Sequence, residues 1–112
     1  FKSGQYSQHL DRLINDNLVV TNEIILSELI PFLRQKNHRK VIRMLERILR
    51  LRLEIDWKEI REFQFRCIKV GLNGVGIPDL IIAQNARQHI CSIYSLDSHF
   101  DDISEILDFD IF

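Results

Sequence analysis

The stretch from Gly76 to Phe100 constrains the fold more than any other part of the chain. It predicts a loop, a helix, a strand and a second loop. Two glycines end the preceding helix, and Pro78 suits a first helical position. Residues 80–86 continue a good helix former that is apolar on nearly all sides. Residues 90–96 are apolar and rich in β-branched and aromatic side chains, which is typical of a buried strand.

Two carboxylates, Asp79 and Asp97, stand at the ends of this helix and strand. In open α/β sheets, ligands bind beyond the carboxyl ends of the strands, so both acids are expected to point at one place. Each also has a simpler interpretation. The helix dipole favours an acid in a first turn. Asp97 or Ser98 would equally suit the cap of a following helix, with Asp101 or Asp102 in its first turn.

Length and composition predict one globular domain over residues 1–112. The chain is 46% hydrophobic and 28% charged, as in ordinary globular proteins. We expect a cytoplasmic protein without membrane attachment, because no apolar run is long enough to span a bilayer and no signal peptide is recognisable. Cys67 and Cys91 lie in apolar segments and are predicted to be buried free thiols.

Charge is distributed unevenly along the chain. The net charge of −1 predicts no general affinity for nucleic acid, yet residues 34–52 hold eight Lys or Arg and a single acid, Glu46. From Asp97 onward there are six acids and no Lys or Arg. A basic face and an acidic face are therefore expected. Residues 37–51 read as a basic amphipathic helix, which is either a solvated surface helix or a phosphate-contacting face.

The remaining elements follow from apolar spacing and cap residues. A strand is predicted at 18–20, and Thr21 or Asn22 is expected to cap the helix that follows it. The other expected elements are helices at 5–15, 23–34, 57–72 and 99–107, a short edge strand at 51–55, and a closing strand at 109–112.

Glu28 lies inside the apolar helix predicted for 23–34. A carboxylate is rarely buried without a partner, and no Lys or Arg stands three or four residues away to pair with it. Pro31 lacks a backbone donor and is expected to bend the helix nearby. We therefore interpret Glu28 as a functional residue, on the condition that it faces the interior.

Three segments together resemble the PIN-domain family, and in particular the VapC-type toxins of bacterial toxin–antitoxin pairs. They are Asn22-Glu-Ile-Ile-Leu-Ser-Glu28-Leu, Gly76-Ile-Pro-Asp79-Leu-Ile-Ile-Ala and Ile93-Tyr-Ser-Leu-Asp97-Ser-His-Phe100. The resemblance covers essentially the whole chain. It implies a three-layer α/β/α fold with a mostly parallel sheet, and a ribonuclease that depends on Mg²⁺ or Mn²⁺.

By motif position, the resemblance implies that Glu28, Asp79 and Asp97 are the catalytic and metal-binding acids. Asp79 is expected to bind the metal directly, Asp97 to hold a second metal or a ligand water, and Glu28 to act through water. Ser95 matches a small hydroxyl residue that precedes the last acid in the family. Asp101 is a further candidate for a supporting role.

The chain departs from the family at its start. PIN domains open with a central strand that ends in the first metal-binding Asp, and no such stretch is present before residue 18. We expect either a fragment of a longer protein or a gap in the sheet that another chain fills. That strand would lie between 18–21 and 93–96, and its loss would leave backbone groups unpaired. Weak metal affinity is expected without its Asp.

Two functions remain open. The first is an endoribonuclease toxin that acts on RNA, pairs into a homodimer, and is neutralised by an antitoxin protein lying between helices 23–34 and 37–51. The second is a non-catalytic PIN-like interaction domain. The RNA target cannot be read from the sequence.

Overall fold

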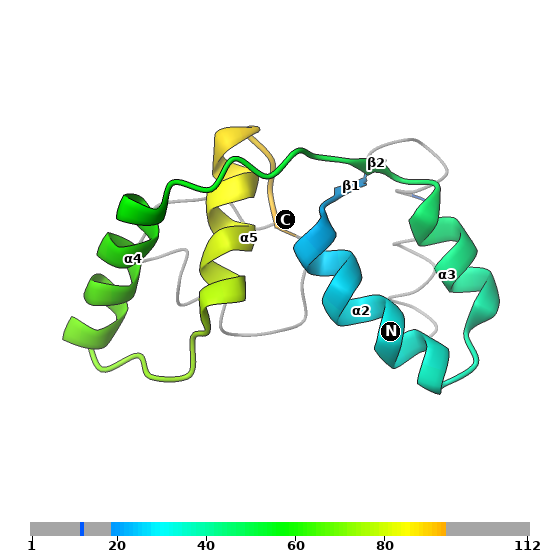
Figure 1. The fold of residues 1–112 in the computed structure, drawn as a ribbon, viewed down its shortest axis with the longest axis horizontal. Helices are drawn as coiled ribbons and strands as arrows, with labels where there is room; N and C mark the ends of the chain where they lie inside the picture. The colour runs from blue at the N-terminus through cyan, green and yellow to red at the C-terminus, as the bar shows by residue number, and fades with distance from the viewer. Residues whose placement is uncertain (1–11, 13–18, 94–112) are drawn as a thin grey trace. The chain divides into compact units, whose positions relative to one another are not determined.

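The computed structural model describes residue 12 and residues 19–93. Its elements are, in order, β1 (Val20–Thr21), α2 (Glu23–Gln35), α3 (Arg39–Glu46), β2 (Leu49–Arg50), α4 (Trp57–Lys69) and α5 (Ile77–Gln88) (Figure 1). The described chain is thus mixed α/β and mostly helical, which confirms the broad fold class. None of the described helices has the length and apolar character needed to cross a membrane.

The chain divides into two compact units, residues 1–52 and 53–112, called the first and second units below. That they form one PIN-like domain with a three-layer architecture stays a prediction. The helices expected at 5–15 and 99–107 and the strand expected at 109–112 lie outside the described residues, apart from helical Arg12.

In the first unit, β1 and β2 form a parallel pair. Val20 is opposite Leu49 and Thr21 is opposite Arg50, and the Leu51 N–H extends the ladder to the Thr21 carbonyl at 2.6 Å. Parallel neighbours need a long crossover, which α2 and α3 provide here. A parallel pair joined through helices is what the α/β prediction required.

Helix α2 begins as predicted. Asn22 is its cap, and its side-chain oxygen accepts a hydrogen bond from the Ile25 N–H at 2.9 Å. The helix runs through Pro31 to Gln35. The core of the unit joins side chains of α2, α3 and the turn before β2: Leu26, Leu33, Leu45 and Ile48, with Val19, Leu29, Ile30, Val41 and Ile42 packed against them.

The helix predicted over 37–51 is wrong in its second half. Helix α3 ends at Glu46, Ile48 is buried in the turn that follows, and Leu49–Arg50 form β2. Pairing with β1 overrides the helical periodicity of this segment. The edge strand expected at 51–55 is likewise displaced, because the strand lies at 49–50 and residues 51–56 have no regular structure.

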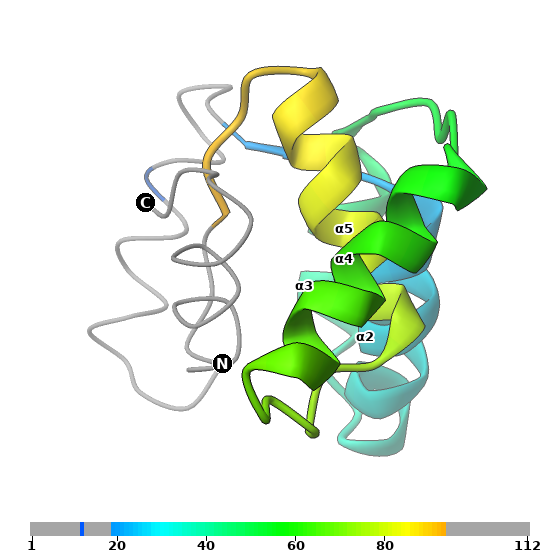
Figure 2. The ribbon, with the colours of Figure 1, turned by 90° about the vertical axis from the view of Figure 1, so that its left-hand side faces the viewer.

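In the second unit, α4 and α5 pack against each other (Figure 2). Asp56 caps α4 by accepting from the Glu59 N–H at 3.2 Å. The helix ends at Lys69 rather than at the predicted residue 72, and Gly71 follows with a φ of 79°. That left-handed conformation is natural for glycine and stops the helix. Buried side chains of this unit include Ile60, Phe63, Cys67, Leu80 and Ile81.

Helix α5 starts at Ile77, with Pro78 as its second residue, close to the prediction. The strand expected from Ile90 does not begin there. Ile90 is 93% exposed and has a φ of 54°, so it belongs to the turn that ends α5. Ile93 is buried and forms an isolated β-bridge, and residues 94–96 lie outside the described part.

Candidate functional site

Glu28 lies on the outer side of α2 and is exposed. The condition that was set for a functional Glu28, an inward-facing side chain, is not met within its unit. Pro31 and Phe32, three and four residues further on, are exposed as well, so this side of the apolar helix points to solvent within its unit. A solvated carboxylate needs no compensating partner, and the argument from burial no longer supports Glu28. Only its place in the motif does.

Asp79 lies in the first turn of α5 and is half-buried. The helix is preceded by Gly76, which offers no side-chain cap. Instead, the Gly76 carbonyl accepts from the Asp79 N–H at 3.1 Å and from the Leu80 N–H at 3.3 Å. The Asp79 carboxylate therefore lies at a helix start where a backbone carbonyl, and no side-chain oxygen, accepts these two N–H groups.

Three described helices carry an acid in their first turn, and two of those acids have partners. On α2, Glu23 accepts from Arg50 at 2.7 Å. On α4, Glu59 accepts from the Gln84 amide at 2.8 Å. Within the described part of the chain, Asp79 alone of the three has neither a hydrogen bond nor an ion pair to its carboxylate. The helix dipole favours an acid at all three positions, and Asp79 differs from the other two only in lacking a partner.

The other predicted site residues, Ser95, Asp97 and Asp101, lie outside the described residues. Glu28 and Asp79 belong to different units. Over residues 12 and 19–93, no three His, Cys, Asp or Glu side chains gather closely enough to hold a metal ion. The convergence of the three acids therefore stays a prediction. Of the two that the structure describes, Asp79 is the partly buried one.

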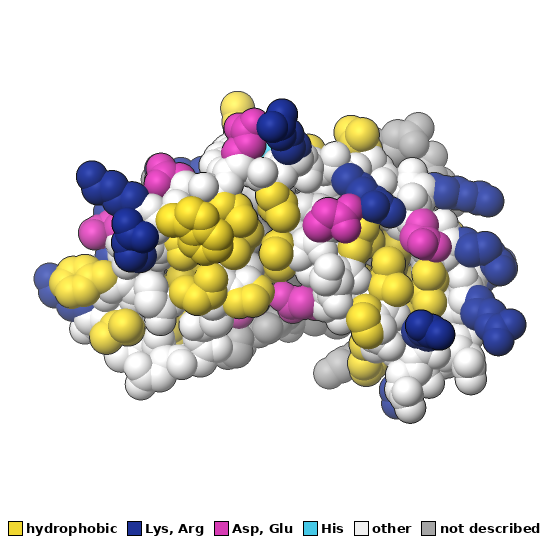
Figure 3. All heavy atoms as spheres, in the orientation of Figure 1, with side chains coloured by type: hydrophobic (Ala, Val, Ile, Leu, Met, Phe, Trp, Pro, Cys, Tyr) yellow, Lys and Arg dark blue, Asp and Glu magenta, His cyan; other side chains and the backbone are white. Residues whose placement is uncertain are grey.

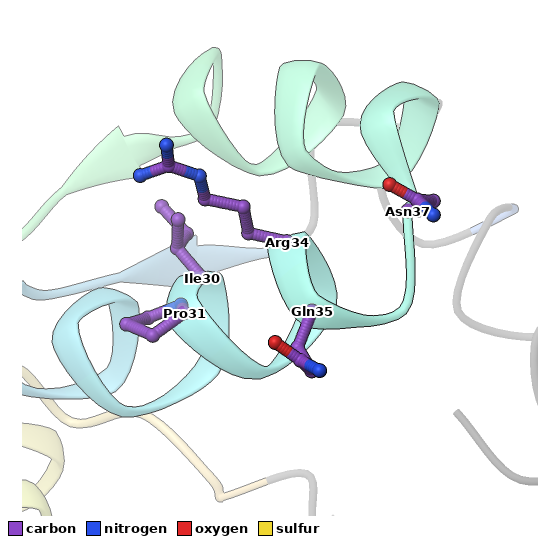
Figure 4. A pocket seen from close by; sticks show the side chains of 5 residues that line it. All are labelled: Ile30, Pro31, Arg34, Gln35 and Asn37. Atoms are coloured by element: carbon purple, nitrogen blue, oxygen red, sulfur yellow. The ribbon is translucent and has the colours of Figure 1, made fainter.

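A pocket of about 440 Å³ lies along the C-terminal half of α2 and the turn before α3 (Figure 4). Its lining is partly apolar and partly polar, from Ile30, Pro31, Arg34, Gln35 and Asn37. Beside it, α3 carries exposed Arg39, Lys40 and Arg43, as the basic segment predicted. This part of the first unit thus combines apolar side chains with amides and exposed cations.

Sequence reasoning missed a polar clamp in the second unit. Gln84 is 2% exposed; its side chain accepts from the Asp56 N–H at 3.1 Å and donates to the Asp56 carbonyl at 3.2 Å and to Glu59. These bonds tie α5 to the start of α4. The available signal was the pair of amides, Gln84 and Asn85, within the otherwise apolar run 80–86, since buried polar groups need partners. A mixed-charge pocket of about 380 Å³ lies beside α4 and Arg87.

The two cysteines are free thiols, as predicted. Cys67 is buried in α4, and burial raises the pKa of its thiol, so it stays protonated and unreactive. Cys91 is only half-buried, which corrects the expectation for it, and its thiol donates to the His89 carbonyl at 3.4 Å.

Comparison of the chain with protein-family models, curated proteins and solved structures finds no match. The likeness to PIN domains therefore rests on the three sequence segments.

Proposed function

We propose that this chain is a metal-dependent endoribonuclease of the PIN-domain type, related to VapC toxins, in which Asp79 binds a Mg²⁺ or Mn²⁺ ion. The observation that carries the proposal is the half-buried carboxylate of Asp79, which has no partner in the described part of the chain, whereas the first-turn acids Glu23 and Glu59 are both engaged. Removing a carboxylate partly from water is unfavourable unless a cation or hydrogen bonds compensate it.

The donor chemistry of Asp79 fits such an ion. Mg²⁺ is commonly held by one or two carboxylates, with waters completing its shell, so a single well-placed Asp suits a direct ligand. Asp97 would supply a second carboxylate, and Glu28, being exposed, would act through water. When bound, the ion would polarise the scissile phosphate and offset the negative charge that develops there. Ser95 and Asp101 would support the acids.

The fold part of the proposal is a three-layer PIN-like sheet. Its support is the parallel pairing of β1 with β2 through a helical crossover, an arrangement of covered α/β sheets. In the proposed fold, the family's central strand would pair with the other edge of β1. The Thr21 hydroxyl of β1 is buried without a hydrogen-bond partner in the described part of the chain, which is compatible with a further polar neighbour near this strand.

The proposed partners are RNA and an antitoxin protein, with a homodimer and a cytoplasmic location. The pocket along Ile30, Arg34 and Asn37 supports the antitoxin position between α2 and α3. The exposed Lys and Arg of α3 support a phosphate-contacting face nearby.

The test is RNA cleavage by the Asp79→Asn variant in the presence of Mg²⁺. Cleavage should fall at least about 100-fold, beyond the usual effect of changing an outer-shell group. Asp56→Asn is the matched control: it makes the same chemical change at another helix start, and Asn caps as well as Asp. Unchanged cleavage by Asp79→Asn would remove this residue from the site.

A non-catalytic PIN-like interaction domain is the second candidate. The exposure of Glu28 favours it, because one of three expected acids lacks a buried setting. This candidate predicts no Mg²⁺-dependent cleavage by the parent protein and no effect of Asp79→Asn on partner binding.

A further inference from the structure

Helix α4 carries a row of alternating aromatic and cationic side chains: Trp57, Arg61, Phe65 and Lys69. Residues four apart form one inclined row on a helix, with a rise of about 6 Å per step. All four side chains are exposed, and the two aromatic residues strongly so, Trp57 at 54% and Phe65 at 58%. Large exposed aromatic side chains in a row call for an explanation.

The two acids of α4 both have partners outside the row, Glu59 with Gln84 and Glu62 with Arg66 at 3.4 Å. Within the described part of the chain, Arg61 and Lys69 have no acidic partner. Figure 3 shows hydrophobic side chains at the surface over α4 and α5, and along the outer edge of α4 it shows Lys and Arg side chains with Asp and Glu side chains among them. The row is thus cationic and aromatic together.

We infer that this row is a binding face for single-stranded RNA, with bases stacked on Trp57 and Phe65 and phosphates held by Arg61 and Lys69. Faces that bind single strands combine cations that track the backbone with aromatic side chains on which bases stack. Arginine adds a cation–π contribution beside a ring. The inference rests on the proposed function in one respect, since RNA is the nucleic acid that function supplies.

The alternation favours RNA over an apolar protein surface. In protein interfaces, the central anchors are apolar and the charges lie at the rim. Here a cation separates the two rings within the row, so the row suits a partner that presents negative charge and flat apolar groups at alternate steps. A nucleic acid strand does this along its whole length.

Trp57 is the only tryptophan of the chain, so its fluorescence reports this face directly. The experiment titrates the full chain carrying Asp79→Asn with a 12-nucleotide oligouridine in EDTA, so that the RNA stays intact. Stacking on Trp57 should quench its emission. Phe65→Ala should weaken binding about 5- to 150-fold. Arg61→Gln with Lys69→Gln should reduce the slope of log K against log salt by about 1.4.

Two matched controls accompany these variants. Phe32→Ala removes a ring of similar exposure from α2, and Arg66→Gln removes a charge of α4 that lies outside the row and is paired with Glu62. Both should leave oligouridine affinity within about twofold of the parent. Circular dichroism establishes that each variant keeps its helices.

Several results would overturn the inference. Heparin that competes fully while oligouridine leaves Trp57 unquenched would show a polyanion surface without stacking. A response to vesicles containing anionic lipid, with none to oligouridine, would show a membrane surface. A signal that depends on protein concentration alone would show contact between two copies. If the parent protein cleaves RNA with metal but Trp57 fluorescence does not respond to oligouridine, the inferred RNA-binding face is rejected and the proposed function stands. If oligouridine quenches Trp57 but the parent protein does not cleave RNA, the proposed function is rejected and the binding face stands.

Discussion

The two units place their predicted site acids in different surroundings. In the first unit, Glu28 lies on the solvent side of α2, while the buried side is filled by Leu26 and Leu33. In the second unit, Asp79 is half-buried at the start of α5, which the Gln84 clamp fastens to α4. Both acids were predicted as site residues from sequence segments that resemble the PIN-domain family. A resemblance in sequence therefore does not fix the surroundings of an acid, and of these two only Asp79 is partly buried.

Substituting Glu28 tests whether the two acids also differ in their effect on RNA cleavage. Glu28→Gln should reduce Mg²⁺-dependent RNA cleavage by about 10- to 100-fold, the range for a group that acts through water. The loss should be smaller than that of Asp79→Asn in the same assay. A Glu28→Gln variant as inactive as Asp79→Asn would show that exposure within its unit misleads about its role.

Cavity formation in the first unit tests whether the two units unfold together. Leu33 is fully buried, and Leu33→Ala should lower the free energy of unfolding by about 2–5 kcal/mol. Trp57 lies in the second unit, so its fluorescence in a urea titration reports on the other half of the chain. The single-domain prediction requires its midpoint to shift with the mutation. A Trp57 transition that does not move would mean two independent domains.

The polar clamp of the second unit can be removed with little change in side-chain size. Gln84→Met leaves the Asp56 backbone groups and Glu59 without their amide partner, and should cost about 1–3 kcal/mol in urea unfolding. The matched control is Gln88→Met, one turn further on, where an exposed amide makes one bond to the Glu54 carbonyl at 2.9 Å. That change should cost under about 1 kcal/mol. An equal loss of unfolding free energy in the two variants would contradict a stabilising role of the Gln84 clamp.

The smallest expected effects concern the helix starts. Asn22→Ala removes the cap of α2 and should cost about 0.5–2 kcal/mol. Gly76→Ser adds a capping oxygen to α5 and should add a few tenths of a kcal/mol, about the difference between glycine and serine caps. The backbone at Gly76 permits it, and a Cβ there would meet Pro78 at an ordinary 3.5 Å. Thermal unfolding checks that Asn22→Ala lowers the stability of the protein and that Gly76→Ser raises it.

The correct predictions depended on local features. The Asn22 cap, the starts of α2 and α4, and the first-turn place of Asp79 follow from residues within a few positions of one another. The errors arose where distant segments decide. Residues 48–50 carry a helical pattern, but β1 draws them into a strand, and Gln84 finds partners only because α4 and α5 pack together.

The argument that Glu28 is buried failed for a different reason. Its apolar neighbours in sequence implied burial, yet Ser27, Pro31 and Phe32 lie on the same exposed side of α2. Reading the helix by face, rather than by composition, would have placed Glu28 with them. The convergence of Glu28, Asp79 and Asp97 depends on contacts across the whole chain, which local spacing does not encode.

Metal binding at Asp79 tests the account most directly. Isothermal titration of the full chain with Mn²⁺ should give measurable heat for the parent protein and for Asp56→Asn. Asp79→Asn should lose that heat while its helix content, measured by circular dichroism, stays the same. Equal Mn²⁺ affinity in the parent protein and Asp79→Asn would contradict the assignment of this carboxylate as a metal ligand.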